Sequence, residues 1–207
     1  MITLFIDTST ESLTIALFKD DVLLSTSTVS SSEHSKYAMP ILEQIFKENN
    51  IKPNKVNKIM VINGPGSFTG IRIGVTIAKI YAWTLNINIV PISSLKAYAI
   101  SNKGYDYYVS IIDARRNYVY AGIYDKDYNN VIKESYISKD ELVDKINYLN
   151  NALIIGDTTL GSFPVISNKI DVVNIYNYFK NDSGINAHMV NPVYLKKTEA
   201  EEKLGDY

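Results

Sequence analysis

Short apolar runs open the chain, and in the second of them apolar and polar positions alternate as in a half-buried strand. The runs cover Met1–Asp7, Leu13–Leu17 and Val22–Val29. The dipeptide Asp20-Asp21 separates the second run from the third, as expected of a tight hairpin turn. The chain therefore begins with a predicted three-stranded meander.

The hydrophobic period then changes to that of a helix. Apolar positions between Tyr37 and Phe46 recur at helical spacing, and we expect a helix with Ser35 as its N-cap that ends near Asn49. Lys58–Asn63 reads as one continuous apolar run, which is typical of a strand covered on both faces. The other elements predicted for this half are a helix over Gly70–Leu85, a strand over Ile87–Ile92 and a short helix that ends at Ile100.

The second half repeats this order in a shorter form. Strands are predicted over Tyr107–Ile112, Tyr118–Tyr124, Val131–Ile137 and Leu153–Ile155, with a helix over Ser138–Leu149 that starts in a Ser138-x-x-Glu141 capping box. Some strand near Asp171–Ile175, a short helix near Ile175–Lys180 and a polar tail complete the prediction. We expect two α/β units, over residues 1–102 and 103–207, that share one duplicated plan.

The composition excludes several classes of function. The 207 residues carry 21 Lys and Arg against 22 Asp and Glu, so no global basic surface for nucleic acid is expected. Cysteine is absent, which excludes disulfides, zinc–cysteine sites and thiol nucleophiles. The two histidines, His34 and His188, are too far apart for a metal motif. With no secretory signal and no long apolar span, we expect a cytoplasmic protein with no membrane contact.

The sequence from Gly64 to Gly74, Gly-Pro-Gly-Ser-Phe-Thr-Gly-Ile-Arg-Ile-Gly, carries the strongest local signal. It joins a buried strand to a helix, where backbone N–H groups favour an anion. It lacks the Lys of a Walker A loop and the spacing of a Rossmann fingerprint. The alternative is a tight turn that lets the helix pack closely on the sheet.

The helix that follows has a small-residue stripe at steps of four, made of Gly70, Gly74, Ala78 and Ala82. Small side chains let a second backbone approach closely. That backbone belongs to the preceding helix, to the sheet or to another protein chain. The apolar surface of the same helix is widened by Ile73, Ile77, Ile80 and Tyr81. A helix that is apolar around much of its circumference is buried on more than one side, by the core alone or also by a partner.

Four polar segments have a structural interpretation beside a functional one. Asp7-Thr8-Ser9 would hold a metal-bound phosphate or complete a turn, and the turn is favoured. His34 is expected to cap a helix or to face solvent. The turn Asp113–Arg116 would contact phosphate, bind a partner's carboxylates or remain solvated. The charged tail Lys196–Lys203 would be solvated or dock on a partner.

Several of these segments together resemble one protein family. Ile6–Ser9, His34-Ser35, Gly64–Gly74, Asp113–Arg116 and Asn191–Leu195 occur in the order seen in the TsaB (YeaZ) family of tRNA threonylcarbamoyladenosine biosynthesis proteins. The resemblance implies an actin-like α/β fold of the sugar kinase/Hsp70/actin type, with mixed sheets in two lobes of related topology. The residues 1–102 would then be the partner-binding lobe and 103–207 a reduced lobe with a C-terminal tail.

The resemblance also implies a role without catalysis. Family members bind and activate TsaD, the transferase that modifies the adenosine 3′ of the anticodon in ANN-decoding tRNAs, and the ATPase TsaE joins them. Alone, they form homodimers through the same surface. ATP and metal are then expected on the partner subunits, no cofactor on this chain, and tRNA contact through the complex. The single histidine in the segment Glu33–Pro40 agrees with the lack of a metal site.

Carried onto this chain, the resemblance places partner binding on the two helices of the first unit. The predicted partner-binding residues are Tyr37, Ile41, Leu42, Ile45, Gly70, Ile73, Gly74, Ile77, Ala78 and Tyr81. Residues that would lie near a nucleotide are Asp7, Thr8, Ser9, Gly64, Gly66, Ser67 and Thr69. No catalytic or metal-ligating residue is predicted.

Two other functions are compatible with parts of the sequence. A stand-alone actin-fold kinase or ATPase would use Asp7, but the second half offers only Gly156-Asp157 and Gly161 as phosphate-binding turns. A peptidase would need a nucleophile elbow or a metal cluster, and neither is present in the sequence.

Overall fold

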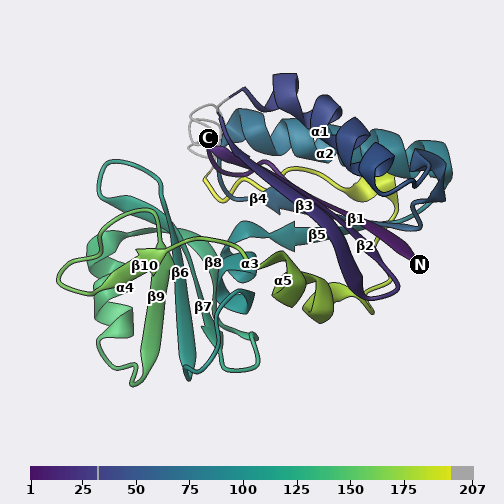
Figure 1. Cartoon of the computed structure of the whole chain (residues 1–207). Helices are drawn as coiled ribbons and strands as arrows, with labels where there is room; N and C mark the ends of the chain where they lie inside the picture. Colours follow the sequence, from purple (N-terminus) through teal and green to yellow (C-terminus); the bar gives the residue numbers. More distant parts are fainter. Residues whose placement is uncertain (32, 197–207) are drawn as a thin grey trace.

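Two five-stranded mixed sheets, each covered by helices, form the framework of the molecule (Figure 1). The structure is a computed structural model and describes residues 1–31 and 33–196. The first sheet and its helices are β1 (Ile2–Asp7), β2 (Ser12–Lys19), β3 (Val22–Ser30), α1 (His34–Glu48), β4 (Lys58–Gly64), α2 (Phe68–Leu85), β5 (Ile89–Ser93) and α3 (Ser94–Ile100). The second sheet and the elements after it are β6 (Tyr107–Asp113), β7 (Tyr118–Asp125), β8 (Asn130–Ser138), α4 (Lys139–Ile146), β9 (Ala152–Gly156), β10 (Val165–Ser167) and α5 (Val172–Phe179).

Both sheets have the same topology. In the first sheet, β1, β2 and β3 form an antiparallel meander and β4 and β5 run parallel to β1, so the order is β3-β2-β1-β4-β5. In the second sheet, β6 to β10 take the places of β1 to β5, and the order is β10-β9-β6-β7-β8. Parallel neighbours need crossover connections. The connection from β1 to β4 contains α1, that from β4 to β5 contains α2 and that from β6 to β9 contains α4, whereas the link from β9 to β10 contains no helix. This repetition confirms the predicted lobes of related topology with mixed sheets.

The first sheet is buried on both faces because its side chains alternate along each strand. Leu4 and Ile6 belong to the core under α1 and α2, whereas Phe5 belongs to the core that α3 and α5 cover. The short helix α3 lies between the two sheets, since Ala97 packs on the first core and Tyr98 packs with residues of the second sheet. The two lobes therefore share α3 as a common buried layer.

The stripe of small residues on α2 faces β1. A Cβ atom added at Gly74 would lie 2.3 Å from the Thr8 hydroxyl oxygen and 3.6 Å from Ile6. Ala78 and Ala82 are also buried. The sheet is therefore the neighbour that the small residues admit, out of the three that the sequence left open.

The chain returns to the first lobe after β10. The Tyr176 ring of α5 stacks on Phe18 of β2, with ring centroids 4.1 Å apart. Ile185 pairs with Ile89 at the edge of the first sheet, and the Val193 N–H donates a hydrogen bond to a carbonyl of β4 at 2.8 Å. The sequence grouped this segment with residues 103–207, but the contacts just described join it to the first sheet.

Two local predictions are wrong. The helix α1 begins at His34 with Glu33 as its N-cap, so Ser35 lies inside the first turn and does not cap it. The predicted strand around Asp171–Ile175 is the start of α5. There the Asp171 carboxylate accepts hydrogen bonds from two backbone N–H groups of the first helical turn, both at 2.9 Å. Such an N-cap stabilises a helix in preference to a strand.

No helix in the described part of the chain combines the length and the apolar character needed to cross a membrane.

Candidate functional site

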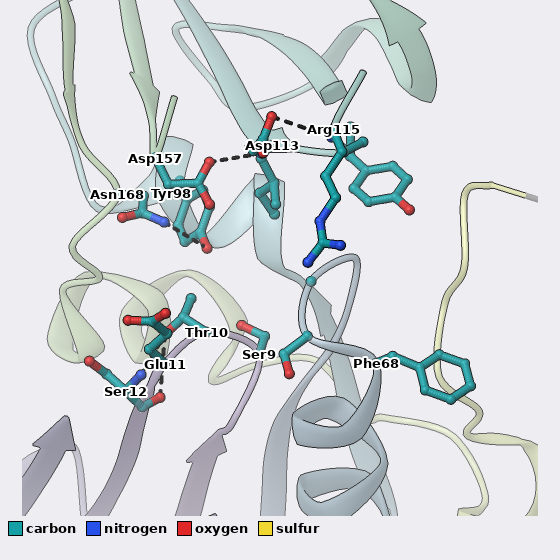
Figure 2. Close-up of a pocket in the computed structure, with 15 residues that line it drawn as sticks. Ser9, Thr10, Glu11, Ser12, Phe68, Tyr98, Asp113, Arg115, Asp157 and Asn168 are labelled. Carbon is teal, nitrogen blue, oxygen red and sulfur yellow. Dashed lines mark hydrogen bonds between the residues drawn. The ribbon is translucent and has the colours of Figure 1, made fainter. Parts of the chain in front are cut away.

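A polar cleft lies between the lobes, where β1 and β6 end (Figure 2). Its cavity has a volume of about 940 Å³. The wall from the first lobe is Ser9–Ser12 with Gly66–Phe68, and the wall from the second lobe includes Ile112–Arg115 and Asp157. The remaining lining residues are Tyr98, Tyr120 and Asn168.

The two walls contain equivalent turns of the duplicated fold. The first follows β1 and the second follows β6, which is the matching strand of the other sheet. Arg115, Arg116 and Asn117 have φ values of 64°, 52° and 64°, so three consecutive residues adopt the left-handed conformation. Figure 2 shows the Arg115 side chain extending from this turn toward the first lobe. The turn Asp113–Arg116, which the sequence left open as a solvated turn, is therefore part of the cleft.

The carboxyl group of Asp7 supports the first wall from behind. It is buried and accepts a hydrogen bond from the Ser9 N–H at 2.8 Å. Burial raises the pKa of Asp7 above its ordinary value. Asp7 lines a neighbouring cavity of about 520 Å³ and is not among the residues that line the larger cleft. Its geometry fits the turn interpretation.

The second wall presents two carboxylates and one arginine. Asp157 accepts a hydrogen bond from the Asp113 N–H at 2.8 Å, and burial, together with the nearby Asp113 charge, raises the pKa of Asp157. Next to them, the hydroxyl of Tyr98 accepts a hydrogen bond from Asn168 at 3.2 Å, and burial raises the Tyr98 pKa well above its usual range. These groups can orient a polar ligand. Within residues 1–31 and 33–196, no group of three or more potential ligating side chains forms a metal site.

The glycines of the Gly64–Gly74 motif serve close packing. A Cβ atom at Gly66 would lie 2.3 Å from the Ser9 carbonyl oxygen, and one at Gly70 would lie 2.0 Å from the Thr8 carbonyl oxygen. The Ser67 N–H donates to the Ser9 carbonyl at 2.7 Å, and the Ser67 hydroxyl accepts from the Gly70 N–H at 3.2 Å. Since these donors are used inside the protein, the tight-turn interpretation accounts for the motif.

The residues predicted to lie near a nucleotide are divided among three places. Ser9, Gly66 and Ser67 line the cleft. Thr8 and Gly64 are buried behind it, as is Asp7. Thr69 faces a different groove, between α1 and α2. Sequence reasoning missed Tyr98 and Asn168, and it named Arg115 and Asp157 without placing them at this site.

Six of the ten residues predicted to bind a partner are buried in the core, so they present no free surface in this structure, and partner binding stays a prediction. They are Ile41, Leu42, Ile45, Gly70, Gly74 and Ala78. Helical periodicity selects the face that packs on the sheet, so it cannot select the face that a partner would contact. Tyr37, Ile73, Ile77 and Tyr81 are only partly buried, and their role stays a prediction.

The outer surface of the two helices carries large apolar side chains that are not in the predicted partner-binding set. Met39 and Phe68 are each 53% exposed, Ile80 is 58% exposed and Trp83 is 70% exposed. A groove of about 430 Å³ runs between the helices and includes Met39, Ile73, Thr76 and Ile77 in its lining. We define the α1–α2 face by its apolar residues, which are Met39, Phe68, Ile73, Ile77, Ile80 and Trp83.

His34 is buried between the cleft and the helices, which corrects the expectation that it faces solvent or caps a helix. Its Nε2–H donates to the carbonyl of Thr10 at 2.7 Å, and its ring lies next to Gly70. Because Thr10 lines the cleft, His34 fixes the start of α1 to the cleft wall. Of the predicted tail Lys196–Lys203, residues 197 onward lie outside the described part of the chain.

The duplicated 3-2-1-4-5 sheets and the cleft between them define an actin-like α/β protein of the sugar kinase/Hsp70/actin class. A solved structure described as YeaZ from Pseudomonas aeruginosa has this fold, with a TM-score of 0.78 and 21% identity, over 94% of this chain and 99% of that one. The family model of TsaD, described as tRNA N6-adenosine threonylcarbamoyltransferase, matches residues 26–175.

Curated proteins of similar sequence identify the family within this fold class. The chain is 41% identical over 139 residues to the tRNA threonylcarbamoyladenosine biosynthesis protein TsaB of Bacillus subtilis, which covers 66% of this chain and 60% of that protein. It is 30% identical to TsaB of Buchnera aphidicola subsp. Schizaphis graminum, over 75% of this chain and 78% of that protein. The chain therefore belongs to the TsaB (YeaZ) family. For three TsaB relatives that are 31–41% identical, the chain spans only 51–60% of their length.

Proposed function

We propose that this chain is a non-catalytic scaffold and activator subunit in the synthesis of tRNA threonylcarbamoyladenosine. It would bind a TsaD homologue, the transferase that modifies the adenosine 3′ of the anticodon in ANN-decoding tRNAs. Family membership supports the pathway, since the relatives are named as tRNA threonylcarbamoyladenosine biosynthesis proteins. The observation that carries the partner-binding role is the α1–α2 face, which leaves six large apolar side chains at least partly exposed.

The character of the α1–α2 face supports a protein partner. Its groove is open and largely apolar, and Trp83, the only tryptophan of the chain, is 70% exposed farther along α2, where it lines a smaller pocket with Ile80 and His188. Large exposed apolar patches mark interaction sites, and tryptophan is enriched among the residues that dominate binding energy. A helical partner of similar fold, such as a TsaD lobe or a second copy of this chain, would bury this face.

The other parts of the proposal follow from the family. TsaE would join the pair, ATP and metal would be held by the partner subunits, and tRNA would be reached through the complex in the cytoplasm. In the absence of TsaD, the chain would form a homodimer through the same α1–α2 face.

Reconstitution tests the role directly. Unmodified tRNA is incubated with threonylcarbamoyl-adenylate synthase, TsaD, TsaE, ATP, threonine and bicarbonate, with and without this chain, and modified adenosine is measured by mass spectrometry. We expect modification only when the chain is present, and no nucleotide turnover by the chain alone. Modification that is equally fast without the chain would refute the role. Turnover by the isolated chain, abolished in Asp7→Ala, would favour a stand-alone kinase or ATPase.

Variants of the α1–α2 face test the binding surface. Met39→Glu and Thr76→Arg change exposed positions that line the groove, so both should fold normally. If the groove is desolvated in the complex, each should weaken TsaD binding by several kcal/mol. Tyr148→Glu, at an 87% exposed position of the second lobe, is the matched control. Normal TsaD binding by both groove variants in calorimetry would place the partner elsewhere.

A further inference from the structure

The three arginines of the chain lie at the cleft or at the neighbouring groove between α1 and α2. The sequence contains 18 lysines but only Arg72, Arg115 and Arg116. Arg115 lines the cleft and Arg116 follows it in the same exposed turn. Arg72 stacks on Phe68, another cleft residue, with its guanidinium carbon 3.7 Å from the ring centroid. In the described part of the chain, none of the three arginines forms an ion pair.

Aromatic rings accompany these arginines on both lobes. On the first lobe, Phe68 and Tyr194 lie 5.1 Å apart, and the Tyr194 hydroxyl accepts a hydrogen bond from the Arg72 Nε–H at 2.8 Å. Phe68 is 53% exposed and Tyr194 is 43% exposed. Figure 2 shows Phe68 on the side of the cleft next to the C-terminal segment.

On the second lobe, a stack of tyrosines continues from the cleft along the sheet. Tyr120 lines the cavity, and its ring lies 5.8 Å from that of Tyr136. Tyr136 in turn stacks on Tyr118 at 4.6 Å with an interplanar angle of 10°. Tyr118 is 38% exposed, and the Lys196 ammonium lies 5.3 Å from the Tyr136 ring centroid. We define the arginine–aromatic belt as Phe68, Arg72, Arg115, Arg116, Tyr118, Tyr120, Tyr136, Tyr194 and Lys196.

We propose that the arginine–aromatic belt binds single-stranded RNA, and that in the complex it contacts the anticodon loop of the tRNA. Arginine matches phosphate with two parallel hydrogen bonds and also stacks on bases. Exposed aromatic rings stack on unpaired bases, which is how single strands are held without base-pair readout. The choice of tRNA rests on the proposed function, whereas binding to single-stranded RNA does not.

The charge distribution favours RNA over an acidic protein as the occupant. The whole chain has a net charge of -1, yet the belt gathers four cations, whereas the carboxylates of Glu11, Asp113 and Asp157 line the adjoining cavity. The apolar residues suited to a protein partner lie mostly on the α1–α2 face, and the two surfaces overlap at Phe68 and Arg72, which both line the groove between α1 and α2. A subunit that binds TsaD through one face could therefore present the other to the tRNA.

Fluorescence anisotropy with two labelled probes tests the inference. One probe is a 17-nucleotide anticodon stem-loop with an ANN anticodon, and the other is a blunt RNA duplex of equal mass. The charge variant is Arg115→Gln with Arg116→Gln, and the stacking variant is Tyr118→Leu. The matched control is Lys47→Gln with Lys52→Gln, which removes two exposed cations far from the belt in sequence.

The two variants should differ in how they lose affinity. The charge variant should raise the stem-loop Kd about tenfold or more and lower the slope of log K against log salt by about 1.4, which corresponds to two phosphate contacts on a single strand. Tyr118→Leu should raise the Kd about 5-fold to 100-fold with the salt slope unchanged. The control should bind like the wild type, and the duplex should bind more weakly than the stem-loop. If Tyr118→Leu does not fold, the charge variant alone decides.

Several results would overturn the inference. The inference fails if the control loses as much RNA affinity as the charge variant, or if the duplex and the stem-loop bind with equal affinity. It also fails if the charge variant binds RNA as tightly as the wild type. A charge variant that loses TsaD but keeps RNA would make the belt a protein interface. Failure of the RNA-binding inference can be told apart from failure of the proposed function by the reconstitution assay. That assay asks whether tRNA modification requires the chain, and its result does not depend on where RNA binds.

Discussion

Replacing Gly70 by alanine should destabilise the protein even though alanine is the better helix former. The new Cβ atom would lie 2.0 Å from the Thr8 carbonyl oxygen, and real Cβ contacts essentially never fall below 3.0 Å. Because the carbonyl belongs to the backbone where β1 ends, rotation of a side chain does not relieve the overlap. Either α2 or the end of β1 must move by about 1 Å.

The size of the effect follows from two opposing contributions. Alanine in place of glycine inside a helix stabilises it by about 1 kcal/mol. Overpacking a close-packed core costs about 1–3 kcal/mol, and the upper end applies here because both elements are backbone. The net loss in the free energy of unfolding for Gly70→Ala is therefore about 2 kcal/mol.

Gly74 provides the matched comparison. A Cβ atom there would meet the Thr8 hydroxyl oxygen, which now donates a 2.6 Å hydrogen bond to the Gly70 carbonyl. The variant Thr8→Ala removes this obstacle to Gly74→Ala but leaves the carbonyl that opposes Gly70→Ala. Urea unfolding followed by circular dichroism would compare the wild type, the three single variants and the two double variants. In the Thr8→Ala background, Gly74→Ala should gain about 1 kcal/mol, while Gly70→Ala should still be destabilising.

One result would refute the packing argument. If Gly70→Ala is neutral or stabilising in both backgrounds, the glycine is not required by the close approach to β1. The anion-binding interpretation of the glycine-rich loop would then regain support, and phosphate binding to the loop would be the next measurement.

Three further predictions concern the interior. Burial raises the pKa of Asp7, so the stability that its protonated form contributes is complete below the unfolded pKa near 3.8 and is lost as the pH rises through the folded pKa. In urea unfolding, the stability of Asp7→Asn relative to the wild type should therefore increase from pH 3 to pH 7. A difference that stays constant with pH would contradict this. His34→Ala should cost about 1–3 kcal/mol in the same assay, because the Thr10 carbonyl loses its hydrogen bond, and a neutral result would show that the bond is dispensable. Tyr176→Leu removes the stack on Phe18 and should speed limited trypsin cleavage after α5, whereas an unchanged rate would show that other contacts hold the segment.

The local structure could be predicted because it depends on nearby residues. The alternation of Leu4 and Ile6 identified β1, and the capping box at Ser138 marked the start of α4, where the Glu141 N–H donates to the Ser138 hydroxyl at 3.2 Å. For six of the ten predicted partner-binding residues, the same periodicity selected positions that are buried in the core. Apolar repeats mark the inner face of a helix, whereas Met39 and Trp83 lie outside that repeat.

The cleft could not be predicted from local patterns. Ser9 and Arg115 line one cavity although they lie in different lobes, and only the duplicated topology brings their turns together. Tyr98 and Asn168 join them through a hydrogen bond between α3 and the segment after β10. Each of these residues has an ordinary sequence context, so the site can be recognised only when the fold brings the residues of the two lobes into one cavity.

The return of the chain to the first lobe determines how the lobes can move. The backbone passes from one lobe to the other twice, once between α3 and β6 and once between β10 and α5. These two connections are tied to each other, since the Asp171 N–H donates to the Ser101 hydroxyl at 2.8 Å. They therefore form a paired connection beside α3, so a change in the distance between Ser9 and Arg115 would have to bend both connections together. A cut in either connection would leave the other as a covalent tether, so the two lobes would stay joined by one strand of chain in place of two.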